Sequence, residues 1–411
     1  MDLLAQFAST FIDYAVVLFV FLVGLLVLGV IAIYIVDRTQ TASTIRRNYP
    51  VVGRFRFFFE HMGEFFRQYF FALDREEMPF NRAQRSWVYR AAKDIDSTVP
   101  FGSTRDLRPV GTVMFINSPF PSLSDESLAP KEISLGEGYC GNPYTTSSVI
   151  NISGMSFGAI SKPAVLALSY GAAKAGSWMN TGEGGLSKYH LEGGADIVFQ
   201  VGTGKFGVRD EKGDLSEEKL ENIAALAQVK MFEIKLSQGA KPGKGGILPG
   251  AKVTQEIAEI RGLMAGEDAI SPNRHHELNS NEDLLDMIVR VRKITNKPVG
   301  FKAVISSSKW LDDLFALIKQ RGLEHAPDYI TVDSADGGTG AAPMSLMDDV
   351  GLPIKESLPM LVDKLIEYDL RDRIKVNASG KLINPTEVAW ALCVGTDFIS
   401  TARGPMFALG L

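Results

Sequence analysis

Cysteine is scarce in this sequence, and an excess of positive charge is absent. Only two cysteines, Cys140 and Cys393, occur among 411 residues, which excludes a disulfide scaffold and a four-cysteine metal site within the chain. The formal net charge is −5 and no arginine-rich face stands out, so we expect no nucleic-acid partner. No repeat of roughly 20 to 50 residues is present, which argues against a solenoid. With 45% hydrophobic and 22% charged residues, the composition is that of a globular protein.

One long segment near the N-terminus lacks charge altogether. Tyr14–Val36 is rich in Val, Leu, Ile and Phe and is long enough for a helix to cross a bilayer. The alternatives are a buried core helix and a signal peptide, but no basic segment precedes it and no small-residue cleavage site follows. Arginines gather only after the segment. The positive-inside rule therefore predicts a single-pass protein of the inner (cytoplasmic) membrane, with the rest of the chain in the cytoplasm.

In the rest of the chain, the pattern of hydrophobic and polar residues changes near residue 130. We predict four parts: an extracytoplasmic tail (1–13), a transmembrane helix (14–36), a juxtamembrane helical and wrapping region (37–130) and a catalytic domain (131–411). In the juxtamembrane region, Gly53–Leu73 interleaves nine Phe or Tyr residues with charged ones. That pattern suits either a helix at the membrane interface or a helix packed on the catalytic domain. Asn81–Lys93 is expected to be helical, and Thr98–Ser134 to be irregular.

Short β-rich runs alternate with helical runs in the catalytic domain. The predicted strands are Val149–Ser153, Trp178–Asn180, Ile197–Val201, Phe232–Leu236, Val299–Val304, Tyr329–Val332, Ile374–Asn377 and Phe398–Thr401. The predicted helices are Lys162–Ala175, Ser216–Gln228, Thr254–Arg261, Asn281–Ile294, Trp310–Arg321, Glu356–Tyr368 and Pro385–Val394. This order predicts an α/β fold, a (β/α)₈ TIM barrel, in preference to a doubly wound sheet. Its closing helix has barely begun when the sequence stops at Leu411, so we expect a barrel without its final helix.

Glycine-rich polar loops follow nearly every predicted strand. The loop at Lys235–Gly250 combines glycines, prolines and lysines, which suits close approach of backbone N–H groups to an anion. Strand ends of a barrel meet at one face, so a flat phosphorylated ligand such as FMN would fit there, with its phosphate at the loops after strands seven and eight. The candidate cofactor-binding residues are Ser153, Gly154, Met155, Ser156, Asn180, Thr181, Asp336, Gly337, Gly338, Thr339, Gly340, Ser379, Gly380, Ala402 and Arg403.

Two lysines lie inside apolar runs near strand ends. Lys235 and Lys302 would be costly to bury without a partner. One interpretation is that they stabilise a reduced, anionic flavin; the other is a salt bridge inside the barrel, for instance with Glu183 or Asp333.

Three patterns resemble known binding motifs but lack the neighbouring residues that those motifs require. Gly202–Gly207 matches G-x-G-x-x-G, but a polar turn follows it where a dinucleotide-binding helix is required. The lysine-bearing loop after Gly239 has the wrong spacing for a P-loop. His275 and His276 are adjacent and lack a third ligand, so no metal site is predicted, although both histidines could line the active site.

The motifs together resemble the FMN-binding synthase domain of glutamate synthase, and in particular the shorter, membrane-anchored FMN-binding glutamate synthase family proteins. They are S-G-M-S-F-G-A-I-S-K (153–162), N-T-G-E-G-G (180–185), K-L-S-Q-G-A-K-P-G-K-G-G (235–246), I-S-P (270–272), D-G-G-T-G-A-A-P (336–343) and L-R-D-R (370–373). Two stretches near the N-terminus, 47–50 and 79–87, are similar to the membrane-anchored subgroup.

The resemblance implies a TIM barrel in which reduced FMN gives a hydride to 2-iminoglutarate, formed from 2-oxoglutarate and ammonia, to make glutamate. Lys241 and Arg261 would hold the two carboxylates of the oxo acid, and Glu183 would lie near the reacting carbon. Lys235, Gln200 and the loop at 337–340 would contact FMN. The charges agree with this, since a dicarboxylate is well bound by two cations, one of them a bidentate arginine.

Departures from the family pattern leave parts of the function open. Ile247 stands where glutamate synthases have a glutamine that is thought to touch the oxo acid, so the resemblance leaves specificity for 2-oxoglutarate open. The iron–sulfur cysteines of the family lie beyond Leu411, so no cluster is expected in this chain. An amidotransferase, or an electron donor such as a membrane quinone, would then be a partner, and a homo-oligomer is left open.

Two other functions stay as alternatives. One is oxidation of a 2-hydroxy acid on the same fold, for which His275 or His276 would be the base. The other is a membrane-tethered flavoprotein that relays electrons or scaffolds a partner without catalysis.

Overall fold

The computed structural model describes residues 2–66, 70–71, 73, 75–96 and 98–410. Residues 67–69 and 72 of the aromatic segment, and the two chain ends at 1 and 411, lie outside the described residues. The chain divides into two compact units, Met1–Ala83 and Gln84–Leu411.

The first unit begins with a long apolar helix, α1 (Asp2–Thr39). Its part Thr10–Thr39 is long and apolar enough to cross a membrane, by length and composition. Its apolar side chains are exposed along this part; those of Phe19 and Leu26 are both more than half accessible. The structure therefore agrees with the helical prediction for Tyr14–Val36, and the membrane span itself stays a prediction.

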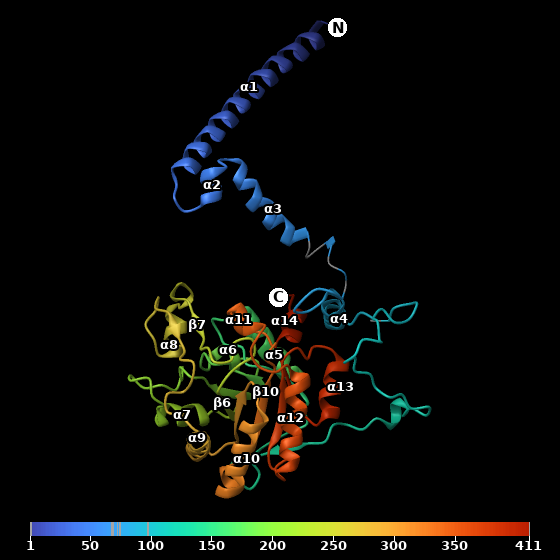
Figure 1. Ribbon diagram of the computed structural model, residues 1–411, viewed down its shortest axis with the longest axis vertical. Coiled ribbons are helices and arrows are strands. Elements are labelled where there is room, and N and C mark those ends of the chain that lie inside the picture. The colour runs from blue at the N-terminus through green and yellow to red at the C-terminus, as the bar shows by residue number, and fades with distance from the viewer. Residues whose placement is uncertain (1, 67–69, 72, 74, 97, 411) are drawn as a thin grey trace. The chain divides into compact units, whose positions relative to one another are not determined.

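An ion pair to a buried carboxylate fixes the turn that follows α1. Two short helices come next, α2 (Thr44–Asn48) and α3 (Val52–Phe66) (Figure 1). Arg54 Nη2, in the first turn of α3, donates to Asp37 Oδ1 at 2.7 Å, and Arg54 Nε donates to Oδ2 at 3.0 Å. The carboxylate also accepts a hydrogen bond from the Val51 backbone N–H at 3.0 Å. Because Asp37 is fully buried, the pair determines the direction in which α3 leaves the turn.

The second unit is built on a closed barrel of eight parallel strands, as the alternation in the sequence predicts. Around the barrel the strands are β3 (Ile150–Ile152), β4 (Met179–Asn180), β5 (Ile197–Val201), β6 (Val229–Lys235), β9 (Val299–Ala303), β10 (Tyr329–Asp333), β11 (Lys375–Ser379) and β12 (Phe398–Thr401). Each predicted strand overlaps one of them. The strands are buried almost throughout, because helices cover the outer face of the sheet and side chains fill its interior.

Helices follow the strands and cover the barrel, as Figure 1 shows for α9, α10, α12 and α13. They are α5 (Lys162–Ala175), α6 (Lys188–Leu191), α7 (Glu217–Ala224), α9 (Asn281–Thr295), α10 (Ser308–Arg321), α12 (Ile354–Glu367), α13 (Pro385–Val394) and α14 (Arg403–Ala408). A further helix, α4 (Arg82–Ala92), precedes the barrel at the predicted place, and a four-residue helix, α11 (Met344–Met347), lies in the loop after β10. Side-chain caps define several starts; Ser161, for example, accepts a hydrogen bond from Ala164 N at the start of α5.

A hairpin lies against the N-terminal ends of the barrel strands. Its strands, β1 (Ile133–Leu135) and β2 (Tyr144–Thr146), pair antiparallel. Leu135 and Tyr144 pack in one cluster with residues at the starts of barrel strands, Trp178, Met231 and Phe398 among them. This end of the barrel is therefore filled by apolar side chains.

The connection between β6 and α9 is a long insertion at the C-terminal ends of the strands. It contains the antiparallel pair β7 (Ile247–Leu248) and β8 (Ala269–Ile270), and the helix α8 (Gln255–Arg261). The sequence predicts this helix correctly but counts it in the strand–helix alternation. The structure instead makes α9 the barrel helix after β6 and leaves α8 free to carry side chains over the barrel mouth.

Candidate functional site

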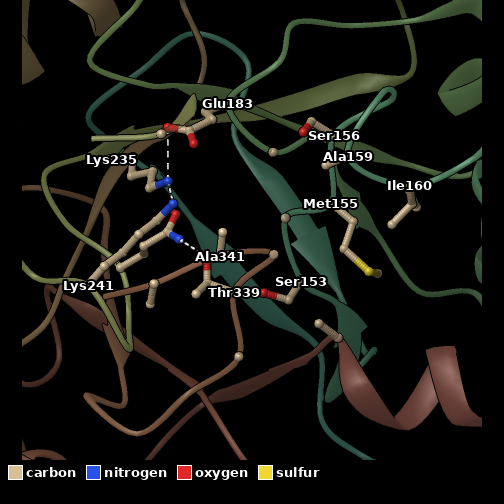
Figure 2. Close-up of a pocket in the computed structure, with 18 of the residues that line it drawn as sticks. Ser153, Met155, Ser156, Ala159, Ile160, Glu183, Lys235, Lys241, Thr339 and Ala341 are labelled. Atoms are coloured by element: carbon tan, nitrogen blue, oxygen red, sulfur yellow. Dashed lines mark hydrogen bonds and ion pairs between the residues drawn. The ribbon is translucent and has the colours of Figure 1, made fainter. Parts of the chain in front are cut away.

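A cavity of about 870 Å³ opens at the C-terminal ends of the barrel strands, within the range of about 300–1,000 Å³ usual for ligand sites. Most of the predicted site residues line it: Ser153, Gly154, Met155, Ser156, Glu183, Gln200, Lys235, Lys241, Arg261, Lys302, Gly338, Thr339, Gly340, Ser379, Gly380, Ala402 and Arg403. They come from all eight barrel strands or the loops after them, and from the β6–α9 insertion. Figure 2 shows several of these side chains converging on the cavity.

Four predicted site residues support the cavity from behind and do not line it. Asn180 and Thr181 are buried, and Asn180 Oδ1 accepts a hydrogen bond from Gly182 N at 2.9 Å. Asp336 forms an ion pair with Lys381 Nζ at 2.9 Å and accepts a hydrogen bond from the Ser334 hydroxyl. Gly337 packs against the carbonyl of Ser334. These residues hold the loops after β4 and β10, and any effect on a ligand would be indirect.

Positive charge dominates the lining. Six lysines and two arginines face the cavity, against two acids, Glu183 and Asp333. Such an excess in a partly enclosed site favours anionic ligands with several negative groups. The cavity therefore has the charge to hold a phosphate and carboxylates at the same time.

The ion pair predicted as an alternative for Lys235 is present. Lys235 Nζ lies 2.9 Å from Glu183 Oε2, and Figure 2 shows the pair beside Lys241. Burial disfavours the charged form of both groups. For Glu183 this effect is outweighed by the positive charges of Lys235, Lys241 and Lys302, so its pKa is lowered. For Lys235 burial is the stronger effect, so its pKa is lowered despite the nearby charge of Glu183. Glu183 is therefore held as a carboxylate facing the cavity. Both lysine interpretations are compatible with this geometry, since the pair lies at the ligand site.

Lys302 is held in a similar way by Asp333. Its Nζ lies 3.6 Å from Asp333 Oδ2, and Oδ2 also accepts a hydrogen bond from Gly239 N at 3.0 Å. Burial opposes the charge on Lys302, but Asp333, Glu233 and Glu183 outweigh it and raise the pKa of Lys302. The ammonium group of Lys302 is thus held by these acids in the lining of the cavity.

The loop after β6 is pressed against the loop after β10. Gly239 is required there, because a Cβ at this position would lie 2.0 Å from the Ser334 carbonyl oxygen. Gln238 bridges the same loops: it accepts a hydrogen bond from Lys235 Nζ, and its Nε2 donates to Thr339 Oγ1 at 2.7 Å. The sequence did not single out Gln238 as a residue with a role of its own, because its partner lies in a loop about a hundred residues away.

Lys241 follows in this loop as a buried cation without a fixed partner. It is 8% exposed and lines the cavity. No hydrogen bond or ion pair of its side chain occurs among residues that the structure describes. Burial lowers the pKa of Lys241, with Glu183 acting in the opposite direction. An anionic ligand group would supply the missing partner.

Arg261 is a second buried cation at the cavity that has no counter-ion among the described residues. It is the last residue of α8, where Gly262 ends the helix with φ +68°, and its side chain is 4% exposed. Arg261 Nη2 donates to the Phe157 carbonyl at 3.3 Å, and the guanidinium lies 5.3 Å from the centre of the Phe206 ring. Its Nε has no hydrogen-bond partner in the described part of the chain, and burial lowers the pKa of Arg261. A buried guanidinium with an unused donor is suited to a carboxylate.

At the other edge of the lining, Arg403 begins α14 and contacts the glycine-rich loop after β10. A Cβ on Gly338 would lie 2.9 Å from Arg403 Nε, so this glycine permits close approach of the loop to the arginine. Gly380 has φ +115° and also lines the cavity. Gly380, after β11, and Arg403, after β12, thus both line the cavity, at the place expected for a phosphate site in this fold.

The histidines are placed away from the cavity. His275 is 1% exposed, its Nε2 bonds to the Lys235 carbonyl at 3.0 Å, and burial lowers the pKa of His275 to about 4. His276 is exposed and lies 2.9 Å from Asp214. The expectation that they could line the site is therefore wrong, and the described cavity lining contains no histidine. The polar turn after Gly207 is also as predicted, since the next helix, α7, begins only at Glu217.

Comparisons with known proteins agree with this picture. The family model described as a conserved region in glutamate synthase matches residues 127–411. The glutamate synthase large subunit-like protein YerD of Bacillus subtilis is 39% identical over 436 aligned positions, which cover 96% of this chain and 82% of that protein. The archaeal-type glutamate synthase [NADPH] of Thermotoga maritima is 37% identical over 258 positions, covering 62% of this chain and 47% of that protein.

The chain thus spans about half the length of the archaeal-type relatives that it matches. Among solved structures, a mandelate oxidase variant aligns over 72% of this chain and 73% of its own, with 17% identity and a TM-score of 0.45.

Proposed function

Because the chain belongs to the glutamate synthase family, we propose that it is an FMN-dependent oxidoreductase that reduces the imine of a 2-oxo acid, or oxidises an amino acid in the reverse direction. The cavity at the strand ends would hold both the flavin and the acid. FMN, when bound, supplies or accepts the hydride. The chain's own residues bind and orient the reactants.

The observation that carries the proposal is the guanidinium of Arg261, which has no carboxylate partner among the described residues. It is buried at the cavity with its Nε unused, and Lys241 lines the same cavity without a counter-ion among the residues described. Leaving buried cations unpaired is costly unless a ligand completes them. Two such cations suit a small dicarboxylate such as 2-oxoglutarate. Glu183, kept ionised by its lysines, could accept a hydrogen bond from the nitrogen of the reacting group.

FMN fits the rest of the lining. The phosphate would lie at Gly380 and Arg403, and Lys235 and Lys302 would face the ring, where a cation stabilises the reduced form. The predicted contacts of Ser153–Ser156, Gln200 and the 338–340 loop complete the cofactor site. Asn180, Thr181, Asp336 and Gly337 would support it from behind.

We also propose that α1 anchors the enzyme in the inner membrane with the barrel in the cytoplasm, because arginines follow the apolar segment and none precedes it. Electrons would come from a partner such as a membrane quinone, and ammonia from solution or from an amidotransferase. Ile247 lines the cavity with more than half of its side chain exposed, so its apolar surface would face the substrate. The assay therefore compares 2-oxoglutarate with a less polar oxo acid.

The test is anaerobic titration of the full-length protein in detergent. Purified protein should show the blue and near-ultraviolet absorption bands of bound flavin. After chemical reduction it should be reoxidised by 2-oxoglutarate plus ammonia, and not by either alone. Reduction of the oxidised protein by glycolate or lactate would instead support a hydroxy-acid oxidase, which the position of His275 and His276 disfavours. A colourless protein that takes up no added FMN would contradict the proposal.

A further inference from the structure

A buried carboxylate, that of Glu233, lies in the barrel below the cavity. It is 2% exposed and precedes Lys235 by two residues on β6, so both side chains point to the same face of the strand. Glu233 Oε1 accepts hydrogen bonds from Gln200 Nε2 at 2.6 Å and from Asn180 Nδ2 at 2.8 Å. Its Oε2 accepts one from Thr331 Oγ1 at 2.6 Å. Both carboxyl oxygens are thus occupied as hydrogen-bond acceptors, an arrangement suited to a negatively charged group.

The donors around Glu233 have fixed orientations. Asn180 Oδ1 is already used by the Gly182 backbone N–H, so its amide nitrogen must be the atom that faces Glu233. Gln200 also points its amide nitrogen at the carboxylate and lines the cavity, so its carbonyl Oε1 points away from Glu233. Glu233 therefore determines which way the Gln200 amide is turned at the cavity floor, with Oε1 directed away from the carboxylate.

The negative charge of Glu233 also acts on the cations of the site. It is one of the acids that keep Lys302 charged against the cost of burial. In a low-dielectric interior such a charge is felt over several ångströms, because little water screens it. Any ligand that gains electrons in the cavity would feel both the lysines and this carboxylate.

We infer that Glu233 is a positioning residue that orients Gln200 and fixes a negative charge beneath the bound ring, so that it limits how strongly the site favours the electron-rich form of the ligand. The inference rests on the proposed function, because it takes that ligand to be FMN. Lys235 and Lys302 favour the reduced flavin, and Glu233 opposes them from below. The reduction potential of the bound flavin would be set by the balance between the positive charges of these lysines and the negative charge of Glu233.

The variant that tests this is Glu233→Gln, which keeps the shape and removes the charge. The new amide oxygen can still accept from Gln200 and Asn180, and its nitrogen can donate to the hydroxyl of Thr331. We expect the variant to bind FMN and the midpoint potential of the bound flavin to rise by at least the equivalent of a tenfold change in the redox equilibrium, about 30 mV for a two-electron couple.

Ser400→Ala is the matched control. Ser400 Oγ accepts a hydrogen bond from Asn377 Nδ2 at 3.0 Å, and the same nitrogen donates to Thr331 Oγ1 at 3.1 Å, so the variant disturbs the same buried network without changing its charge. A merely structural role for Glu233 would lower the melting temperature in both variants and leave both potentials at the wild-type value. A raised potential in Glu233→Gln alone supports the inference, and equal potentials in all three proteins overturn it.

A reciprocal variant covers the case in which Glu233→Gln does not fold. Combining Glu233→Gln with Gln200→Glu retains one carboxylate and one amide in contact but places the charge at the cavity. We expect its flavin potential to fall below that of the wild type, and a potential equal to or above the wild type would overturn the inference. A wild-type protein without flavin would contradict the proposed function itself, whereas a normal wild type with unresponsive variants contradicts only the role of Glu233.

Discussion

Replacing Arg261 by methionine separates substrate binding from cofactor binding. Methionine keeps an apolar stem against the Phe206 ring and removes a guanidinium that has no carboxylate partner among the described residues. If Arg261 holds one carboxylate of the oxo acid through two charge-assisted hydrogen bonds, each worth about 1.5–3 kcal/mol, the loss is at least about 3 kcal/mol. That corresponds to a weakening of roughly 100-fold or more.

The assay is the reoxidation of reduced, FMN-loaded protein at increasing concentrations of the oxo acid with ammonia in excess. The concentration for half-maximal rate should rise by about that factor, while the FMN content stays at the wild-type level. The ligand-free variant should be as stable as the wild type or more so, because an unpaired buried charge has been removed.

Arg209→Met is the matched control for this experiment. Arg209 also lies over the Phe206 ring, at 5.9 Å, but is absent from the cavity lining. Arg209→Met should leave the dependence of the reoxidation rate on the oxo-acid concentration unchanged. The reasoning is refuted if Arg261→Met releases FMN without weakening the oxo acid, or if both variants weaken it equally.

Two further predictions concern stability. Asp328 is fully buried between Arg292 Nε and Arg373 Nη1, each 3.0 Å from one of its oxygens. Asp328→Asn should therefore destabilise the barrel by roughly 3–5 kcal/mol and lower the melting temperature, while the amount of FMN bound per folded molecule stays unchanged. Burial lowers the pKa of His190 and His275 to about 4, whereas both histidines take up a proton near pH 6.5 in the unfolded chain. The free energy of unfolding should therefore decrease as the pH falls from about 6.5 to 4, by roughly 3 kcal/mol per histidine. His190→Gln should make the decrease of the melting temperature over this pH range shallower.

The barrel could be predicted from the sequence because its signals are local. Parallel strands buried on both faces read as short apolar runs, and each is followed by a glycine-rich turn and an amphipathic helix. The same regularity led to one misassignment: α8 has the pattern of a barrel helix, and only its contacts show that it belongs to an insertion. Periodicity reports which face of a helix is buried, but not the element against which it packs.

The residues that the sequence missed depend on distant contacts. Glu233 lies inside an apolar run, and the donors that satisfy it come from three other strands, at Asn180, Gln200 and Thr331. A single carboxylate in a buried strand is itself a signal, since its burial requires partners, and it would have identified the position but not its role. Conversely, the sequence suggests His275 as a candidate base because of its residue type. In the structure it is buried, bonds to the Lys235 carbonyl and does not line the cavity.

Position along a strand separates supporting residues from binding residues more reliably than membership of a motif. Asp328 immediately precedes β10 and forms its ion pairs with Arg292 and Arg373, whereas Asp333 ends β10 and lines the cavity beside Lys302. Arg373 belongs to the L-R-D-R segment (370–373), and this segment therefore helps to hold the N-terminal end of the barrel together. Charges there are paired within the protein. The cavity, in contrast, contains buried cations such as Arg261 and Lys241 that the described residues leave without a counter-ion, and these are the groups through which the site would bind its substrate.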